Sequence, residues 1–341
     1  MTTHDEQAFL NAIVAAPDDD TPRLVFADWL DERGTDDDRA RAALIRAQCR
    51  IEVLPKGNKE RKKLEREAKA ILKANELKWT AELRAAKLGT KWTFRRGFLD
   101  GGTMSPTSFV EKGADLFRLA PTLRAMTFPN AANEVTELAA SPYLERLASV
   151  DLTLMCTCGW CGIDEELRDL FKSKNAANLR CLNVSRDRID LGVAGALARA
   201  KVLTNLTELN LSDNPFGPEG GAALAKSKHL SNLTSLNLSR TNLQSEGTRA
   251  IATAKQFTTL TALYLSGNTI DADGVAALVA APWFDGLKEL DLSANPITEQ
   301  GAKALATVNE NLDQLDLRAT GLGKRATAHL KSAFGTRVKL A

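Results

Sequence analysis

Apolar residues recur along the second half of the chain with a period of 27 residues. Four close copies of one segment, LTELNLSDNPF, LTSLNLSRTNL, LTALYLSGNTI and LKELDLSANPI, begin at Leu206, Leu233, Leu260 and Leu287. Looser copies begin at Leu179, Leu312, Leu147 and Leu123, so the chain holds about eight units. Repetition at a fixed period of this length is typical of proteins that stack one structural unit many times.

Each unit combines two local patterns. Its first residues alternate between apolar and polar, which predicts a short strand with one buried face. Its second half carries a glycine that is followed four residues later by an apolar residue among alanines, as in Gly220 with Leu224 and Gly247 with Ile251. That spacing predicts a short helix packed closely against its neighbours. A single unit cannot bury its leucines, whereas stacked units share a continuous core. We therefore expect an α/β solenoid with parallel strands on the concave side and helices on the convex side.

The order L-x-x-L-x-L-x-x-N in these segments resembles the leucine-rich repeat, over roughly residues 120–341. The unit length and the helical second half resemble its ribonuclease-inhibitor-like subclass. Some proteins of that subclass inhibit or activate a catalytic partner. The chain departs from the pattern at the asparagine position, which holds Asn214, Asn268 and Asn295 but Thr241 and Thr320. We expect threonine hydroxyls to hold those two turns in place of amides.

The N-terminal residues predict three helices. The first carries an apolar stripe and ends at Pro17, and the second begins with Thr21 as its cap and stops at Gly34. The third opens with an acidic turn, which suits the positive end of a helix dipole. The run AFLNAIVAAPDDDTPRLVFADWLDERG, followed by RAALIRAQC, resembles a short bacterial repeat-companion domain found beside repeat domains in planctomycete-type bacteria. The resemblance implies no mechanism.

Two further segments lie between these helices and the repeats. Asn58 can cap a long helix that ends at Gly89, and KWTFRRGFLDGGTMS predicts a strand that seals the first repeat. The predicted organisation is an acidic all-α domain at residues 1–54, a basic helical neck at 55–90, a cap at 91–122 and the repeats at 123–341.

Charge is distributed unevenly along the chain, although its net value is only +2. Residues 1–40 hold 11 acidic and 3 basic side chains, whereas residues 41–100 hold 17 basic and 7 acidic ones. Glutamates alternate with the basic residues of the neck and no aromatic cluster accompanies them. We therefore interpret the neck as a solvated helix face rather than a nucleic-acid site.

The composition indicates a soluble cytoplasmic protein. No apolar run approaches the roughly 20 residues that a membrane span needs, and the N-terminus has no basic and apolar leader. Five cysteines, an odd number, do not resemble the disulfide framework of a small secreted domain. We expect reduced thiols and no membrane association.

The polar positions between the strand leucines predict a surface for binding another protein. Side chains alternate along a strand, so these residues face the concave side. The surface is mildly acidic and carries one aromatic residue. The residues that we expect to contact the partner are Asp151, Asn183, Glu208, Asn210, Asn237, Tyr264, Glu289, Asp291, Asp316 and Arg318.

Three thiols, Cys156, Cys158 and Cys161, stand within MCTCGWCGID. Structural zinc usually takes four ligands, so these cysteines need a fourth, for which Cys181 or a neighbouring carboxylate is a candidate. A zinc site, a redox pair and an ordinary loop are the three interpretations. We favour the ordinary loop, and therefore no cofactor.

No motif predicts catalysis. The chain lacks G-x-x-x-x-G-K-[ST], G-x-S-x-G and H-E-x-x-H, and its three histidines are scattered. Our first hypothesis is therefore a non-catalytic scaffold that binds a partner protein through the concave face. A second is a regulator of a catalytic partner, of the inhibitor or GTPase-activating type. A third is a thiol or zinc sensor that uses the loop Cys156–Cys161.

Overall fold

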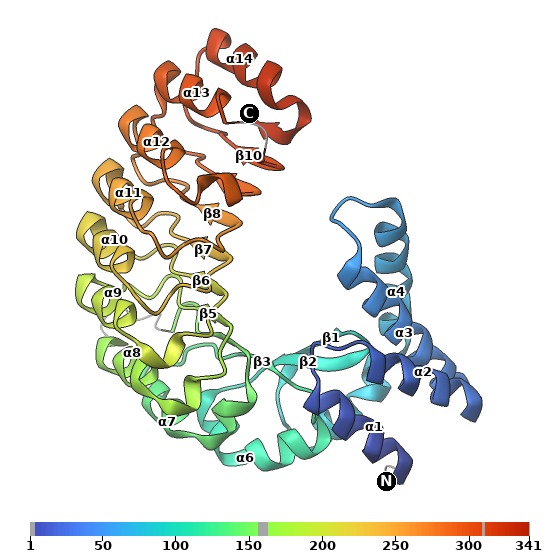
Figure 1. Cartoon of the computed structure of the whole chain (residues 1–341). Coiled ribbons are helices and arrows are strands. Elements are labelled where there is room, and N and C mark those ends of the chain that lie inside the picture. Colours follow the sequence, from blue (N-terminus) through green and yellow to red (C-terminus); the bar gives the residue numbers. More distant parts are fainter. Residues whose placement is uncertain (1–3, 156–162, 309–310, 341) are drawn as a thin grey trace. The chain divides into compact units, whose positions relative to one another are not determined.

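A computed structural model describes residues 4–155, 163–308 and 311–340 of the chain. The chain forms two compact units, one up to Thr127 and one from Phe128 onward (Figure 1). The cysteines Cys156, Cys158 and Cys161 lie outside the described residues. Among the described residues, no helix has both the length and the apolar character that crossing a membrane requires.

The first unit combines helices with a small sheet. Its elements in chain order are α1 (His4–Ala15), α2 (Thr21–Arg33), α3 (Asp36–Val53), α4 (Lys59–Trp79), α5 (Ala81–Ala85), β1 (Thr90–Arg95), β2 (Phe98–Thr103), α6 (Pro106–Leu119) and β3 (Ala125–Thr127). The predicted stop of α2 at Gly34 is confirmed, because Gly34 adopts the left-handed conformation with φ of 73°. The predicted cap of α4 is also confirmed, because Asn58 accepts hydrogen bonds from the backbone of Glu60 and Arg61.

Two local predictions for the first unit are wrong. Thr21 is the first residue of α2 and not its cap; its N–H donates to Oδ1 of Asp19 at 2.8 Å. The long helix is broken at Thr80, which is buried. The Thr80 hydroxyl donates to the carbonyl of Glu76 at 2.7 Å and accepts from Nε of Arg84 at 2.8 Å. A side chain that bonds the backbone four residues earlier bends or ends a helix.

The expected sealing strand is a hairpin. Its strands β1 and β2 pair in antiparallel fashion, with Arg95 opposite Phe98, and β2 then pairs in parallel with β3. The two turn residues, Arg96 and Gly97, both have positive φ, of 52° and 83°, as the tight turns favoured in hairpins require. A Cβ at Gly97 would lie 2.6 Å from Cα of Ile45 on α3. Glycine therefore lets the turn touch α3.

The hairpin and the first three helices share one core. Phe98 of β2 packs with buried side chains of the helices, namely Ile13, Phe26, Ala27, Leu30, Ala42, Ile45 and Cys49. Trp29 packs against this cluster and stacks on Phe26 at 5.5 Å between ring centroids. The helices and the cap were predicted to be separate segments. That they form separate domains stays a prediction.

A buried arginine fixes the loop between α1 and α2. Arg23 is 6% exposed and donates to the carbonyls of Asp19 at 2.6 Å and Pro17 at 2.8 Å. Arg96 of the hairpin turn also donates to Pro17, at 3.3 Å, and pairs with Asp20 at 3.2 Å. The run PDDDTPR is therefore explained by structural contacts.

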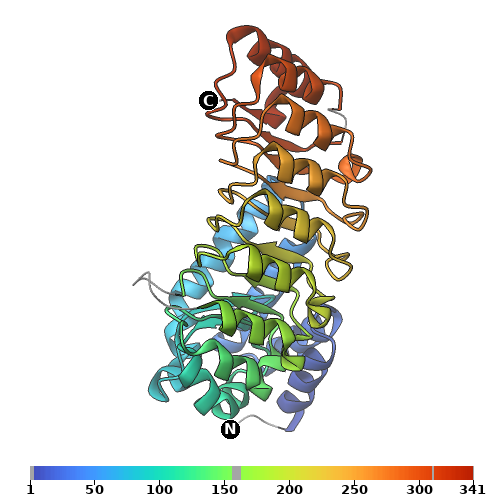
Figure 2. The same cartoon turned by 90° about the vertical axis from the view of Figure 1, so that its left-hand side faces the viewer.

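The second unit is a stack of strand and helix repeats. Its strands are β4 (Ser149–Asp151), β5 (Cys181–Asn183), β6 (Glu208–Asn210), β7 (Ser235–Asn237), β8 (Ala262–Tyr264), β9 (Glu289–Asp291), β10 (Gln314–Asp316) and β11 (Val338–Lys339). Its helices are α7 (Val135–Ala140), α8 (Ile163–Lys172), α9 (Leu191–Ala198), α10 (Gly217–Ala225), α11 (Gln244–Ala252), α12 (Ala272–Val279), α13 (Thr298–Ala306) and α14 (Lys324–Phe334). The strands follow the inner side of the stack and the helices its outer side (Figures 1 and 2).

The strands of this unit confirm the expected α/β solenoid. From β4 to β10 each strand pairs in parallel with the next, and equivalent repeat positions lie opposite one another, as Leu209 opposite Leu236. The middle residue of each strand is buried, so the strands contribute a continuous apolar ladder to the core. The short strand β11, parallel to β10, was not predicted.

Buried asparagines join successive repeats. Asn268 is fully buried, and its Oδ1 accepts from the N–H groups of Thr241 and Leu243, both at 3.0 Å. Its Nδ2 donates to the carbonyls of Leu238 at 2.6 Å and Leu265 at 3.1 Å. Asn214 and Asn295 make the same bonds at their own positions. Each amide thus satisfies backbone groups that a solenoid turn would otherwise bury without partners.

The two threonines at the asparagine position act through their hydroxyls, as predicted. Thr241 donates to the carbonyl of Leu238 at 2.8 Å, and Thr320 donates to that of Leu317 at 2.6 Å. A hydroxyl is too short to reach the previous repeat as an amide does. In the repeat before each threonine, a backbone hydrogen bond within the turn takes the place of the missing amide. The N–H of Phe216 donates to the backbone carbonyl of Asn214, and the N–H of Ile297 donates to the backbone carbonyl of Asn295.

Candidate partner-binding surface

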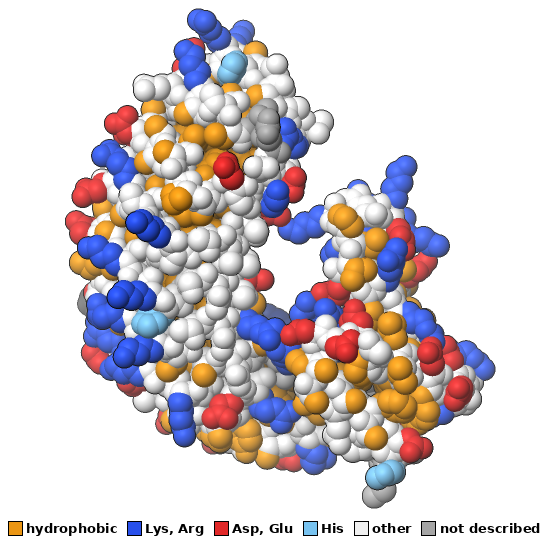
Figure 3. All heavy atoms as spheres, viewed as in Figure 1, with side chains coloured by type: hydrophobic (Ala, Val, Ile, Leu, Met, Phe, Trp, Pro, Cys, Tyr) orange, Lys and Arg blue, Asp and Glu red, His pale blue; other side chains and the backbone are white. Residues whose placement is uncertain are grey.

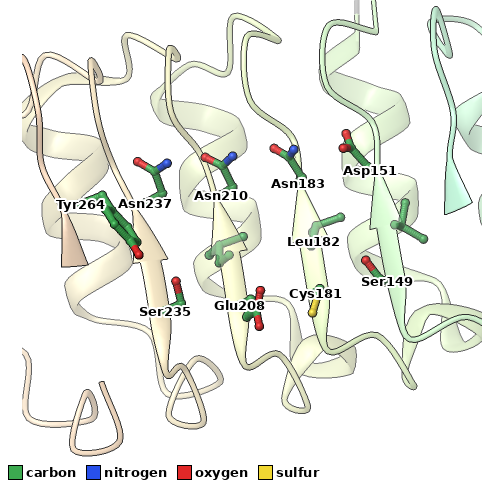
Figure 4. A pocket seen from close by; sticks show the side chains of 12 residues that line it. Ser149, Asp151, Cys181, Leu182, Asn183, Glu208, Asn210, Ser235, Asn237 and Tyr264 are labelled. Carbon is green, nitrogen blue, oxygen red and sulfur yellow. The ribbon is translucent and has the colours of Figure 1, made fainter. Parts of the chain in front are cut away.

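The strand residues on either side of the buried ladder form two columns on the concave surface. The first column contains Ser149, Cys181, Glu208, Ser235, Ala262, Glu289 and Gln314. The second column contains Asp151, Asn183, Asn210, Asn237, Tyr264, Asp291 and Asp316. Figure 4 shows both columns crossing β4 to β8, with the asparagines in one row. The register of the strand pairing therefore places the strand residues predicted to contact a partner side by side on the concave surface.

Every residue of the second column except Tyr264 also closes the turn after its strand. Oδ1 of Asn210 accepts from the N–H of Ser212 at 3.1 Å, and Oδ1 of Asp291 accepts from that of Ser293 at 2.8 Å. The same bond is made by Asp151, Asn183, Asn237 and Asp316. Side-chain oxygens that bond the backbone two residues later stabilise turns. One oxygen of each residue is thus committed to the fold, and the remaining polar groups face the concave side.

Tyr264 interrupts the row of small side chains. Its hydroxyl donates to Oε2 of Glu289 at 2.8 Å. Partial burial, followed by this hydrogen bond and by the charges of Glu289, Asp291 and Glu208, raises the pKa of Tyr264 to about 12. Glu289 on β9 thus contacts the hydroxyl of Tyr264, Asp291 lies opposite Tyr264 in the β8–β9 pair, and Glu208 lies two strands away on β6.

At the C-terminal end of the concave surface, Asp316 and Arg318 form an ion pair with each other. Asp316 is 6% exposed, and its Oδ2 accepts from a terminal nitrogen of Arg318 at 2.6 Å. Burial raises the pKa of Asp316, but the Arg318 guanidinium outweighs this effect and holds that pKa below its usual range. Asp316 is thus less accessible than sequence analysis expected, and Arg318 neutralises its charge.

A shallow hollow of ≈ 310 Å³ lies over β4 to β8 (Figure 4). Predicted residues line it, among them Asp151, Asn183 and Tyr264, but so do Ser149, Cys181 and Ser235 of the first column. Those three residues were not predicted to contact a partner. The same alternation that selected Glu208 and Glu289 applies to them, so the signal was present in the sequence.

Charge differs between the two sides of the second unit. Figure 3 shows Lys and Arg side chains mainly along the outer, helical side, whereas the strand region in this view is mostly uncharged. The acids Glu208, Glu289 and Asp291 on the strands lie in the same region as Tyr264. A basic partner would find complementary charge there.

The described residues contain no group of three or more His, Cys, Asp or Glu side chains placed to hold a metal ion. Cys181 lies opposite Ser149 in the β4–β5 pair, where the repeat alignment placed it. The other three thiols fall outside the described ranges, so zinc at that loop stays a prediction.

A family model described as a leucine-rich repeat matches residues 202–225, 229–252, 258–279 and 287–306. The four segments resemble leucine-rich repeats, and together they cover less than half of the chain. The alternation of strands and helices continues beyond them in the structure, from β4 to β10, although Asp187 and Thr320 stand at the asparagine position there. Comparison with curated proteins finds no match.

Two solved structures are similar to this chain at low identity, with TM-scores below 0.5. A crystal structure of the Rad7 and Elc1 complex in yeast is 13% identical, with a TM-score of 0.33, over 97% of this chain and 84% of that chain. A crystal structure of the TLR13–ssRNA13 complex is 19% identical, with a TM-score of 0.40, over 71% of this chain and 36% of that chain. This chain thus spans about a third of the length of the second protein.

Proposed function

We propose that this leucine-rich-repeat protein is a non-catalytic scaffold that binds a partner protein through the concave face of its second unit. The observation that carries the proposal is the position of Tyr264: its hydroxyl bonds Glu289, it lies opposite Asp291, and it lines the same hollow as Glu208. Tyrosine is enriched among the residues that dominate binding energy. Register places this ring beside the hollow over β4 to β8, where a partner side chain can be enclosed.

The charges of this group define the partner's chemistry. A lysine or arginine side chain can lie over the Tyr264 ring and pair with an adjacent carboxylate. Such a cation–π contact contributes about 0.5–1 kcal/mol at an exposed site and more when water is excluded. At the far end Arg318 already neutralises Asp316, so the attraction is centred on β6 to β9. We propose a partner with a basic segment, and the acidic surface disfavours nucleic acid.

The finer assignments belong to the same proposal. Unit length and helical second halves support placement in the ribonuclease-inhibitor-like subclass. The run AFLNAIVAAPDDDTPRLVFADWLDERG supports a bacterial repeat-companion domain at the N-terminus. We propose a cytoplasmic location on the composition of the chain.

A charge-reversal experiment tests the proposal. The concave variant carries Glu208→Lys and Asp291→Lys, and the matched control carries Glu219→Lys and Glu246→Lys on helices α10 and α11. Glu219 and Glu246 are exposed, and the two variants change the net charge by the same amount. Each is used as bait in lysate of the source organism, and the proteins retained are quantified by mass spectrometry.

The proposal predicts a partner that is retained by the natural chain and by the helix variant and is lost from the concave variant. Equal retention by all three baits would contradict it. Circular dichroism of both variants shows whether the repeats remain folded.

A further inference from the structure

The first unit contains an open cavity of ≈ 280 Å³ that no part of the proposed function uses. Side chains from α1 to α6, β1 and β2 line it, together with the segment that follows α6. Most of its wall is apolar, including Leu10, Leu30, Leu83 and Leu99. One side chain of α3, Arg41, brings a positive charge into this wall.

Aromatic rings enclose the Arg41 guanidinium. Its central carbon lies 4.8 Å from the ring centroid of Trp79, 5.5 Å from that of Phe94 and 5.3 Å from that of Phe98. Stacking of this kind stabilises the cation and fixes its plane. The rings themselves are held, because Trp79 donates from Nε1 to Asp37 at 3.0 Å and Phe98 belongs to the buried core. The cation is therefore positioned before any ligand arrives.

The carboxylates that line the cavity form ion pairs or hydrogen bonds with residues other than Arg41. Asp37 pairs with Lys78 at 2.8 Å, and Asp38 accepts from the Thr35 hydroxyl at 2.7 Å. Glu6 lies 3.7 Å from Arg33. Within the described chain, Asp37 and Glu6 attract the Arg41 charge only at longer range, and neither accepts a hydrogen bond from it.

The Arg41 cation is thus partly shielded from water, and no carboxylate of the described residues forms a close ion pair with it. Burial outweighs the attraction of Asp37 and Glu6 and lowers the pKa of Arg41 to about 10. A guanidinium presents five N–H donors in a planar fork that matches the two oxygens of a carboxylate. An anion bound there would replace the lost hydration with charge-assisted hydrogen bonds. The surrounding leucines and rings would cover an apolar group attached to it.

We propose that this cavity binds a carboxylate carried on a compact apolar group, with the fork of Arg41 holding the two carboxylate oxygens. A free carboxylic acid and the C-terminal residue of a peptide both present this chemistry. The proposal concerns the first unit alone and stands independently of the concave face.

Titration calorimetry with matched probes tests the site. N-acetyl-L-leucine supplies the carboxylate and an apolar side chain, and N-acetyl-L-leucinamide supplies the same side chain without the charge. We expect heat of binding from the acid and at least about a tenfold weaker affinity for the amide, since a hydrogen bond to a charged group contributes about 1.5–3 kcal/mol. Equal binding of both probes, or binding of neither, would overturn the proposal.

A second pair of probes identifies the source of the ligand. A short peptide that ends in leucine is compared with its C-terminally amidated form and with N-acetyl-L-leucine. Tighter binding of the free-carboxylate peptide than of N-acetyl-L-leucine assigns the site to peptide termini. The reverse order assigns it to free acids.

Variants on one helix provide the protein-side control. Arg41→Gln removes the fork, and Arg39→Gln removes an exposed arginine of α3 that pairs only with Asp36 at 2.9 Å. Loss of N-acetyl-L-leucine binding in the first variant and its retention in the second is the expected result. Unchanged binding in a folded Arg41→Gln protein would overturn the proposal. The acid and amide comparison needs no variant, so it decides the question even where Arg41→Gln does not fold.

Discussion

The hydroxyl of Tyr264 on β8 donates a 2.8 Å hydrogen bond to Oε2 of Glu289 on β9. The bond joins the second column of one repeat to the first column of the next, and it fixes the orientation of the aromatic ring on the concave face. A partner would therefore meet a positioned ring with a negative edge rather than a mobile side chain. The conformational entropy lost on binding is smaller when the side chains of the binding surface are already ordered.

This relationship predicts a pH dependence. The folded chain raises the pKa of Tyr264 from 10.0 to about 12, so folding favours the neutral phenol. The corresponding stability is present below pH 10 and is lost as pH rises from about 10 to about 12. The chain has two tyrosines, so a Tyr143→Phe background leaves Tyr264 alone, and ultraviolet absorbance of tyrosinate measures its titration.

Adding Glu289→Gln to that background removes the nearby charge. We expect the titration midpoint of Tyr264 to move down toward its ordinary value. An unchanged midpoint would show that burial alone raises the pKa and that the Glu289 carboxylate contributes nothing.

The asparagine ladder predicts a large difference between two amides one repeat apart. Asn268→Ala leaves buried backbone groups without partners, at a cost of about 1–3 kcal/mol for each group, and water cannot replace the amide because Asn268 is fully buried. We expect a loss of roughly 3–5 kcal/mol in unfolding free energy, measured by denaturant titration. Asn237→Ala, which removes one acceptor from a half-exposed turn, should cost about 1 kcal/mol or less.

The buried asparagines also show how much of the fold could be predicted from the sequence. A repeat period of 27 residues selects the strands, their faces and the buried asparagines, because stacking forces equivalent residues into register. Even the threonine turns follow from chemistry, since a hydroxyl can replace one amide bond. Such predictions depend only on spacing and donor type.

Elements outside the repeats were less predictable. The hairpin depends on two consecutive residues with positive φ, Arg96 and Gly97. An arginine in the sequence does not indicate a positive φ, so the turn could not be predicted. The break at Thr80 depends on a hydroxyl bonding the backbone in place of solvent. The concave residues were predictable as a face, but the pairings of Tyr264 with Glu289 and of Arg318 with Asp316 depend on side-chain rotamers. The Arg41 cavity is built from eight helices and strands, so no local sequence pattern predicts it.

Two helical glycines provide another test. Alanine is favoured over glycine in helices by about 1 kcal/mol, yet a Cβ at Gly247 would lie 2.9 Å from Cα of Pro218 on the neighbouring helix. We expect Gly247→Ala to destabilise the chain by roughly 1–3 kcal/mol through overpacking. At Gly195 the nearest atom is the flexible end of Arg199 at 3.4 Å. Gly195→Ala should therefore be neutral or stabilising in the same thermal unfolding experiment.

The hairpin turn tests the architecture of the first unit. At Gly97, alanine would combine a positive φ with a Cβ 2.6 Å from Cα of Ile45. We expect Gly97→Ala to separate the turn from α3 and to expose the shared aromatic core, so that limited proteolysis cleaves the N-terminal helices faster. The control is Gly57→Ala, which also has positive φ but no atom within 4 Å of the added Cβ. Equal protection of both variants would contradict the described packing.

The central claim is that the concave face of the repeats, and not their helical side, contacts the partner. Site-specific photo-crosslinking measures this directly, with a photoreactive residue placed at Asn210 in the hollow or at Glu219 on α10. The account predicts a partner adduct from position 210 and none from position 219. An adduct formed only from position 219 would contradict it.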